Sequence, residues 1–225
     1  MVKKNVIITG ATGMVGGYAL DNCLSSDDVE KVTAIVRRPT GKEHHKLIEV
    51  IHEDFTDYSS IADHLRDQDV ALFCIGVYTG TVPDDEFERI TVDYTVEFVK
   101  ALLENSGPVS FCFLSGAGAD RKEKSRMIFA RSKGRAENFL LRQDLKSLHI
   151  FRPGYIYPVE KRKEPNLTYR ITRALWPVIK RVSPSMGVNS NDLGSVIADI
   201  GLHGGNKETY ENRDILEHVK RMRAL

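Results

Sequence analysis

Glycines recur every three residues near the start of the chain, in the stretch TGATGMVG from Thr9 to Gly16. This stretch follows a short β-branched run and opens an amphipathic segment, so it is placed where a strand turns into a helix. Glycines allow a tight turn and close approach of the backbone to a pyrophosphate, which the helix N-terminus also favours. We therefore predict a dinucleotide-binding loop made of Gly10, Ala11, Thr12, Gly13, Met14, Val15 and Gly16.

Arg37 and Arg38 follow the second β-branched run. A carboxylate about 20 residues past the glycine loop would bind the ribose hydroxyl of NAD. Two arginines instead suit the 2′-phosphate of NADP, because a guanidinium makes paired hydrogen bonds to phosphate oxygens. The sequence thus predicts NADP(H) in preference to NAD(H). The alternative is a pair of solvent-facing arginines at a strand end.

Asp54 and Phe55 follow the third β-branched run. Asp54 is placed to accept a hydrogen bond from the adenine amino group, with Phe55 alongside the ring. The alternative for Asp54 is a capping or turn aspartate, because aspartate side chains bind the backbone two residues on.

Short β-branched runs alternate with amphipathic segments through the first half of the chain, as in βαβ units. Buried strands are expected at Val6–Thr9, Val32–Val36, Ile48–Ile51, Val70–Ile75, Phe111–Leu114 and His149–Phe151. Helices are expected over 84–104, 125–142, 189–203 and 214–222. This pattern predicts the α/β class: a doubly wound parallel sheet of Rossmann type in one NAD(P)-binding domain, 1–225, in which 158–225 forms a small substrate-side lobe.

An apolar stripe with arginines and lysines between its members lies in that lobe, at Leu167, Ile171, Leu175 and Ile179. Such a helix could lie on a membrane surface, but packing on the core or over a substrate cleft is the preferred interpretation.

Composition and charge narrow the function classes further. The chain has 225 residues, of which 41% are hydrophobic and 28% charged, as in folded globular proteins. The apolar run Val6–Ile8 is too short for a signal peptide, so the cytoplasm is expected. The three cysteines and seven histidines lack ligand spacing, so no metal site is expected. Basic blocks such as 121–126 are interleaved with acids, which makes nucleic-acid and membrane partners unlikely.

Several stretches together carry a resemblance to a known family. They are TGATGMVG, Asp54-Phe55, the CIG of Cys74, Ile75 and Gly76, FLSGAGAD, Lys133-Gly134 and FRPGYIYP. In order and spacing, from about residue 4 to 203, the chain resembles an atypical short-chain dehydrogenase/reductase. Within that superfamily it is similar to the compact Tat-interacting-protein-like branch, also described as NAD-dependent epimerase/dehydratase-like.

The resemblance implies roles for individual residues. Cys74, Ile75 and Gly76 would run beneath the adenosine ribose, and Lys133 would bind the nicotinamide ribose hydroxyls. Backbone groups of Pro153, Gly154 and Ile156 would face the carboxamide. Ser115 occupies the position of the catalytic serine that polarises the substrate carbonyl or hydroxyl.

The chain departs from the family pattern at the catalytic tyrosine. Reductases of this superfamily use Tyr-x-x-x-Lys, which places both side chains on one helix face so that the lysine lowers the phenol pKa. Here the segment is FARSK, and Phe129 stands where the tyrosine would be. A phenyl ring transfers no proton, so an acid or base worth roughly 10²–10⁴-fold in rate is missing.

Two interpretations follow. In the preferred one, the protein is an NADP(H)-dependent oxidoreductase that transfers hydride to or from a small carbonyl or alcohol, and Ser115, Tyr155 or a water supplies the proton. In the other, it is a non-catalytic NADP(H) sensor that acts on a partner. Tyr155 has the alternative role of a packing tyrosine. The substrate stays unnamed, and either a monomer or a homodimer is compatible with the sequence.

Overall fold

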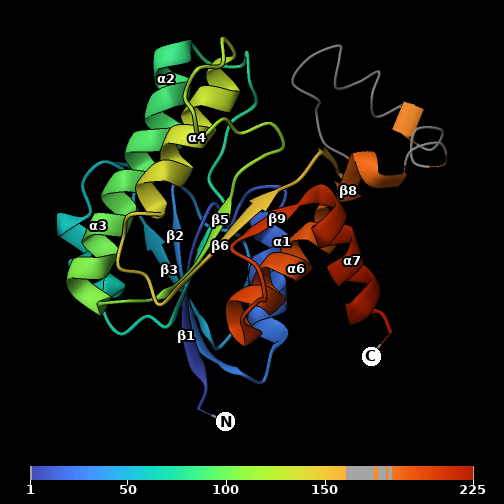
Figure 1. Ribbon diagram of the computed structural model, residues 1–225. Helices are drawn as coiled ribbons and strands as arrows, with labels where there is room; N and C mark the ends of the chain where they lie inside the picture. Colours follow the sequence, from blue (N-terminus) through green and yellow to red (C-terminus); the bar gives the residue numbers. More distant parts are fainter. Residues whose placement is uncertain (1, 161–174, 177–180, 182–183, 225) are drawn as a thin grey trace.

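Seven parallel strands form the central sheet of the computed structural model, which describes residues 2–160, 175–176, 181 and 184–224 (Figure 1). Their order across the sheet is β3-β2-β1-β4-β5-β6-β9. The strands are β1 (Lys4–Thr9), β2 (Val29–Val36), β3 (Leu47–Ile51), β4 (Val70–Phe73), β5 (Ser110–Leu114), β6 (Ser147–Arg152) and β9 (Thr209–Glu211). The strand order reverses direction at β1 and β4, and ligands of such sheets bind outside the carboxyl ends at this point. The predicted doubly wound α/β fold is confirmed.

Helices cover both faces of the sheet, which is why its strands are apolar on both sides. On one face, α1 (Gly16–Ser25), α6 (Ser190–His203) and α7 (Asn212–Met222) pack over Val6, Ile8 and Leu72. On the other face, η1 (Ser59–Leu65), α3 (Tyr94–Ser106) and α4 (Ile128–Leu140) pack over Ile7, Phe73 and Phe111. Figure 1 shows the two helical layers with the sheet between them.

The long helix expected over 84–104 has a wider turn inside it. It consists of α2 (Asp84–Glu88), the π-helical turn η2 (Arg89–Asp93) and α3. The apolar face is nevertheless continuous, because Phe87 and Phe98 are both buried.

The helix expected from 125 begins later, at Ile128. The Asp120 carboxylate accepts hydrogen bonds from the backbone N–H groups of Lys122, Lys124 and Ser125, at 2.9, 2.9 and 2.8 Å. These bonds hold the preceding segment in a loop.

Three short strands were not expected from the sequence. β7 (Tyr155–Tyr157) pairs in parallel with β8 (Gly187–Asn189), and β9 pairs with β6 at the sheet edge. Each has three residues, which is too few to show an alternating pattern. The short helical turn η3 (Pro184–Met186) leads into β8.

The C-terminal region beyond Pro158 contributes to the main fold. β9 joins the central sheet, and α6 packs against α1 through Gly194, where a Cβ would lie 2.6 Å from the Cβ of Tyr18. Of the predicted apolar stripe, Leu167, Ile171 and Ile179 lie outside the described residues. Leu175 is described, and half of its surface is exposed.

The cysteines Cys23, Cys74 and Cys112 are buried free thiols. Within the described ranges, no cluster of side chains is suited to holding a metal ion. No helix among those same residues combines the length and apolar character needed to cross a bilayer.

Candidate functional site

The glycine loop lies tightly against the end of β4. Gly10 has a φ of +75°, and a Cβ there would come 2.6 Å from the backbone carbon of Cys74. A Cβ on Gly16 would lie 2.2 Å from the carbonyl oxygen of Gly10. A side chain at either position would therefore push the loop away from the carboxyl ends of β1 and β4. Only glycine permits this approach.

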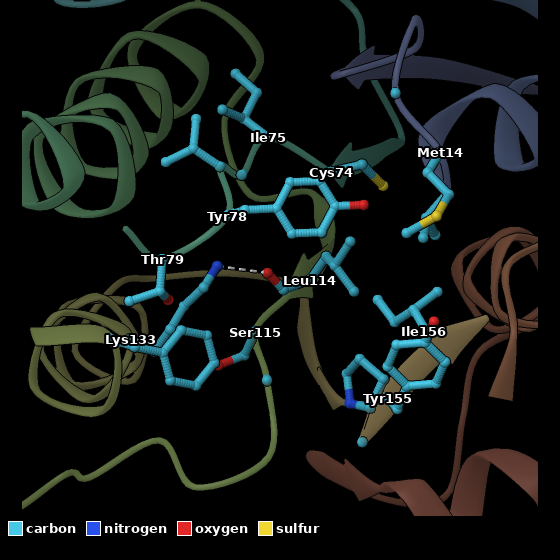
Figure 2. Close-up of a pocket in the computed structure, with 18 residues that line it drawn as sticks. Met14, Cys74, Ile75, Tyr78, Thr79, Leu114, Ser115, Lys133, Tyr155 and Ile156 are labelled. Atoms are coloured by element: carbon cyan, nitrogen blue, oxygen red, sulfur yellow. Dashed lines mark hydrogen bonds between the residues drawn. The ribbon is translucent and has the colours of Figure 1, made fainter. Parts of the chain in front are cut away.

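A pocket of about 290 Å³ opens at those carboxyl ends (Figure 2). It brings together four separate parts of the predicted site: the loop, the end of β4, the end of β5 with α4, and the segment after β6. Its lining residues are Gly13, Met14, Val15, Cys74, Ile75, Gly76, Val77, Tyr78, Thr79, Leu114, Ser115, Gly116, Phe129, Lys133, Pro153, Gly154, Tyr155 and Ile156. In Figure 2, Lys133 and Ser115 lie on one side of the pocket and Met14 and Ile156 on the other.

Lys133 extends from α4 into this pocket and is buried. Its Nζ donates a 2.9 Å hydrogen bond to the carbonyl oxygen of Leu114 (Figure 2). The same Nζ lies 4.9 Å from the centre of the Phe113 ring. Burial lowers the pKa of Lys133 to about 8, although Glu137 and Cys74 favour the charged form. The amine therefore exchanges its proton much closer to neutral pH than an exposed lysine does.

Ser115 directly follows β5, and its hydroxyl donates to a buried carboxylate. Its Oγ lies 2.6 Å from Oε1 of Glu137, a residue on α4 whose side chain has no exposed surface. Glu137 also binds two arginines, Arg121 through Nε at 2.8 Å and Arg152 through Nε at 2.9 Å. A second nitrogen of Arg152 contacts the other carboxylate oxygen. Burial alone would raise the pKa of Glu137, but the hydrogen bonds from Arg152, Ser115 and Arg121 outweigh it and lower the pKa.

Sequence reasoning missed Glu137. The signal was available, because Phe129, Lys133 and Glu137 are spaced by four residues and so share one helix face. What the spacing does not reveal is that Arg121 and Arg152 converge on the same carboxylate from two other segments.

Phe129 and Tyr155 line the pocket from different elements. The Phe129 ring packs on Gly116, where a Cβ would lie 2.4 Å from the end of the ring. Tyr155 begins β7, and its ring centre lies 5.2 Å from that of Trp176. Tyr155 thus has both the pocket position and the packing contact that the sequence left as alternatives.

A second pocket of about 400 Å³ lies on the other side of the glycine loop. Its lining includes Ala11, Thr12, Arg38 and Lys42, and Lys42 forms a 2.7 Å ion pair with Asp21. Arg37 is exposed and, within the described part of the chain, lines neither pocket. Of the two predicted arginines, Arg38 is the one that lines a pocket together with residues of the glycine loop.

Asp54 and Phe55 lie apart from both pockets. The Asp54 side chain is engaged in a turn, accepting a hydrogen bond of 2.9 Å from the backbone N–H of Thr56. Phe55 is buried, with its ring stacked 5.5 Å from that of Tyr94. The contacts seen for Asp54 are those of the turn aspartate that the sequence offered as its alternative.

These residues fit a nicotinamide dinucleotide. Gly10 and Gly16 form a cradle without side chains, so a pyrophosphate could approach the backbone of the loop closely. The cradle leads into the N-terminus of α1, which favours anions. A buried cation, Lys133, lies in the pocket next to the cradle.

Comparison with known proteins agrees with this geometry. A family model described as NAD(P)H-binding matches residues 10–200. Protein HTATIP2 of Rattus norvegicus is 29% identical over 167 residues, covering 73% of this chain and 68% of that protein. A protein of Emericella nidulans named fmp52, mitochondrial, is 25% identical and covers 96% of this chain and 99% of that protein. The cytoplasmic location expected for this chain therefore stays a prediction.

A solved short-chain dehydrogenase/reductase from Saccharomyces cerevisiae has the same fold. It superimposes with a TM-score of 0.67 at 15% identity and covers 94% of this chain and 96% of that chain. The family model and the similarity to HTATIP2 confirm the resemblance to the atypical short-chain dehydrogenases/reductases, and the chain belongs to the NAD(P)H-binding family.

Proposed function

We propose that the protein is an NADP(H)-dependent oxidoreductase acting on a small carbonyl or alcohol. One observation carries the proposal: Lys133 and Ser115 line the same pocket as the glycine loop and the segment Pro153–Ile156. A bound nucleotide would supply the hydride, and the protein would supply position and polarity. Residues 158–225 would cover the substrate side of the site.

The nucleotide would be held by backbone and cations. Gly10–Gly16 would bind the pyrophosphate, and Cys74–Gly76 would lie beneath the adenosine ribose. Pro153, Gly154 and Ile156 would face the carboxamide, and Lys133 would bind the ribose hydroxyls. Asp54 would contact the adenine from its turn position, and the buried Phe55 would lie alongside the ring.

NADP(H) is favoured over NAD(H) by the charges around the second pocket. Arg38 and Lys42 line it together with Ala11 and Thr12, while Arg37 is exposed at the end of β2. Asp21 neutralises part of this charge through its ion pair with Lys42. Arg38 is therefore the first candidate for the 2′-phosphate contact and Arg37 the second.

The proton would be carried by Lys133 in place of the missing tyrosine. Its amine lies in the pocket and has a pKa of about 8, which is near the range that a general acid or base requires. Tyr155 and a water are the further candidates, because the Ser115 proton is donated to Glu137. This assignment makes Phe129 compatible with catalysis.

The alternative is a non-catalytic NADP(H) sensor, and Phe129 is the observation that favours it. If Phe129→Tyr alone produced reductase activity from an inert parent, the sensor function would gain support. Carbonyl reduction by the natural protein that is lost in Lys133→Met would exclude it.

The test is a calorimetric titration of the purified protein with NADPH and NADH separately. Micromolar NADPH binding that clearly exceeds NADH binding supports the proposal and justifies a substrate screen. Binding of neither nucleotide would overturn both functions. Light scattering on the same sample distinguishes monomer from homodimer, and cell fractionation tests the cytoplasmic location.

A further inference from the structure

We propose that the ligand group facing Ser115 is a hydroxyl that donates a hydrogen bond to Oγ, so that the pocket selects an alcohol over the ketone of the same skeleton. This inference rests on the proposed oxidoreductase function and names the chemical form of the substrate that the site binds best. It assigns to Glu137 the role of a positioning residue that determines whether the Ser115 hydroxyl accepts or donates a hydrogen bond in the pocket.

The direction of the Ser115 hydrogen bond follows from its partner. A hydroxyl has one proton to donate and two lone pairs to accept with, whereas an ionised carboxylate only accepts. The 2.6 Å separation of Oγ and Oε1 of Glu137 is typical of a charge-assisted bond. The single proton of Ser115 is therefore directed at Glu137, and its lone pairs are left for the pocket.

Glu137 remains ionised because two arginines bind it from outside the pocket. Arg121 and Arg152 both contact its Oε2, while Oε1 receives Ser115 and Nε of Arg152. Losing the Ser115 proton to a ligand would leave a fully buried carboxylate with one donor fewer, which costs more than losing a neutral hydrogen bond.

A hydroxyl and a carbonyl meet Ser115 differently. A substrate hydroxyl can donate a hydrogen bond to Oγ. A carbonyl oxygen has no proton to donate, so its lone pairs and those of Oγ would repel each other. Phe129 offers no donor to compensate, because its phenyl ring replaces the phenol. The Lys133 amine can donate to a hydroxyl oxygen as well as to a carbonyl oxygen, so it does not discriminate between the two ligands. The neighbouring walls, among them Met14, Ile75, Leu114 and Ile156, are apolar. The preferred ligand is thus a secondary alcohol on a compact hydrocarbon skeleton.

In Glu137→Gln, the Ser115 hydroxyl should change from a hydrogen-bond acceptor to a hydrogen-bond donor towards the pocket. Two arginine nitrogens bind Oε2 and only one binds Oε1, so the amide oxygen of Gln takes the Oε2 position. Its NH₂ group then faces Ser115 and donates to Oγ, which frees the serine proton for the pocket. Glu208→Gln is the matched control, because Glu208 is half exposed and contacts Arg121 without touching Ser115.

The experiment measures cyclohexanol and cyclohexanone binding to the full chain saturated with tetrahydro-NADP, an unreactive analogue of NADPH. In the natural protein and in Glu208→Gln, the alcohol should bind about tenfold more tightly, the value of one hydrogen bond. Ser115→Ala should reduce the ratio to about one, and Glu137→Gln should invert it. If Glu137→Gln fails to fold by circular dichroism, Ser115→Ala decides alone.

Three results would overturn the inference. They are equal or tighter ketone binding by the natural protein, an alcohol preference that survives Ser115→Ala, and no binding of either compound to the nucleotide complex. In each of these the analogue binds, so the nucleotide binding that the proposed function requires stands. Failure of the analogue itself to bind identifies failure of the proposed function, on which the inference depends.

Discussion

The two charged regions beside the glycine loop differ in how their charges are held. In the α4 wall, made of Ser115, Lys133 and Glu137, the side chains are buried and each has a defined partner. At the end of β2, Arg37 and Arg38 are exposed to solvent. Burial strengthens electrostatic interactions, while water and salt screen exposed charges. The α4 wall can therefore hold hydrogen bonds in a defined direction. The exposed arginines can only favour one nucleotide over the other.

The largest effect is expected from Glu137→Leu, which leaves Arg121 and Arg152 without their shared carboxylate. Breaking a buried ion pair by removing one partner costs about 3–5 kcal/mol of unfolding free energy. Glu208→Gln, at the exposed end of the same network, should cost less than about 1 kcal/mol. Urea denaturation measures the unfolding free energy of both variants. Equal losses in the two variants would contradict the expected difference between the buried and the exposed end of the network.

Lys133→Met tests the proton carrier. We expect turnover of a screened carbonyl substrate to fall roughly 10²–10⁴-fold, the usual contribution of a general acid. In the natural protein, reduction needs the protonated amine, so its rate should fall as pH rises through about 8, while alcohol oxidation should rise. A stopped-flow pH profile measures both directions. A reduction rate that is independent of pH around 8 would contradict the assignment.

Gly16→Ala tests the junction between the two regions. Its new Cβ would lie 2.2 Å from the Gly10 carbonyl oxygen, so we expect a loss of about 1–3 kcal/mol in stability together with weaker NADPH binding. Gly17→Ala is the control, because its Cβ would make an ordinary 3.4 Å contact with the Ala11 oxygen. Thermal unfolding should place Gly17→Ala at or above the natural protein, since alanine favours helix.

Arg38→Glu tests the exposed region. We expect NADPH affinity to fall about tenfold with little change for NADH, and the difference should shrink at high salt. Arg37→Glu should have a smaller effect, because Arg37 lies outside the lining of the second pocket. Calorimetry at low and high ionic strength measures both variants. If NADPH and NADH affinities fall equally, Arg38 does not choose the nucleotide.

The smallest effect concerns His203, which bridges Asp28 and Asp199 at 3.1 and 2.9 Å on the protein surface. The hydrogen bond to Asp28 is the largest cause that raises its pKa above 6.5, and burial opposes the increase. The stabilisation is thus fully present below about pH 6.5 and is lost as pH rises through the raised pKa. We expect the midpoint temperature of thermal unfolding to be ~1–3 °C lower at alkaline pH than below pH 6.5. This decrease should be absent in His203→Gln and retained in the control His45→Gln.

The sequence by itself determined the layered α/β fold and the glycine loop. Both depend on local signals: β-branched runs of the right length, helical periodicity, and glycines placed between a strand and a helix. It also identified Ser115, Lys133 and Phe129, because their spacing matches a family pattern residue by residue.

Only the tertiary structure decided what surrounds those residues. The three-residue strands β7, β8 and β9 form through pairing with distant partners, which no local pattern records. Glu137 receives Arg121 and Arg152 from other segments, and burial rather than residue type lowers the pKa of Lys133. Solvent exposure and the direction of a hydrogen bond arise from contacts between segments far apart in the chain, so they appear only once the chain has folded.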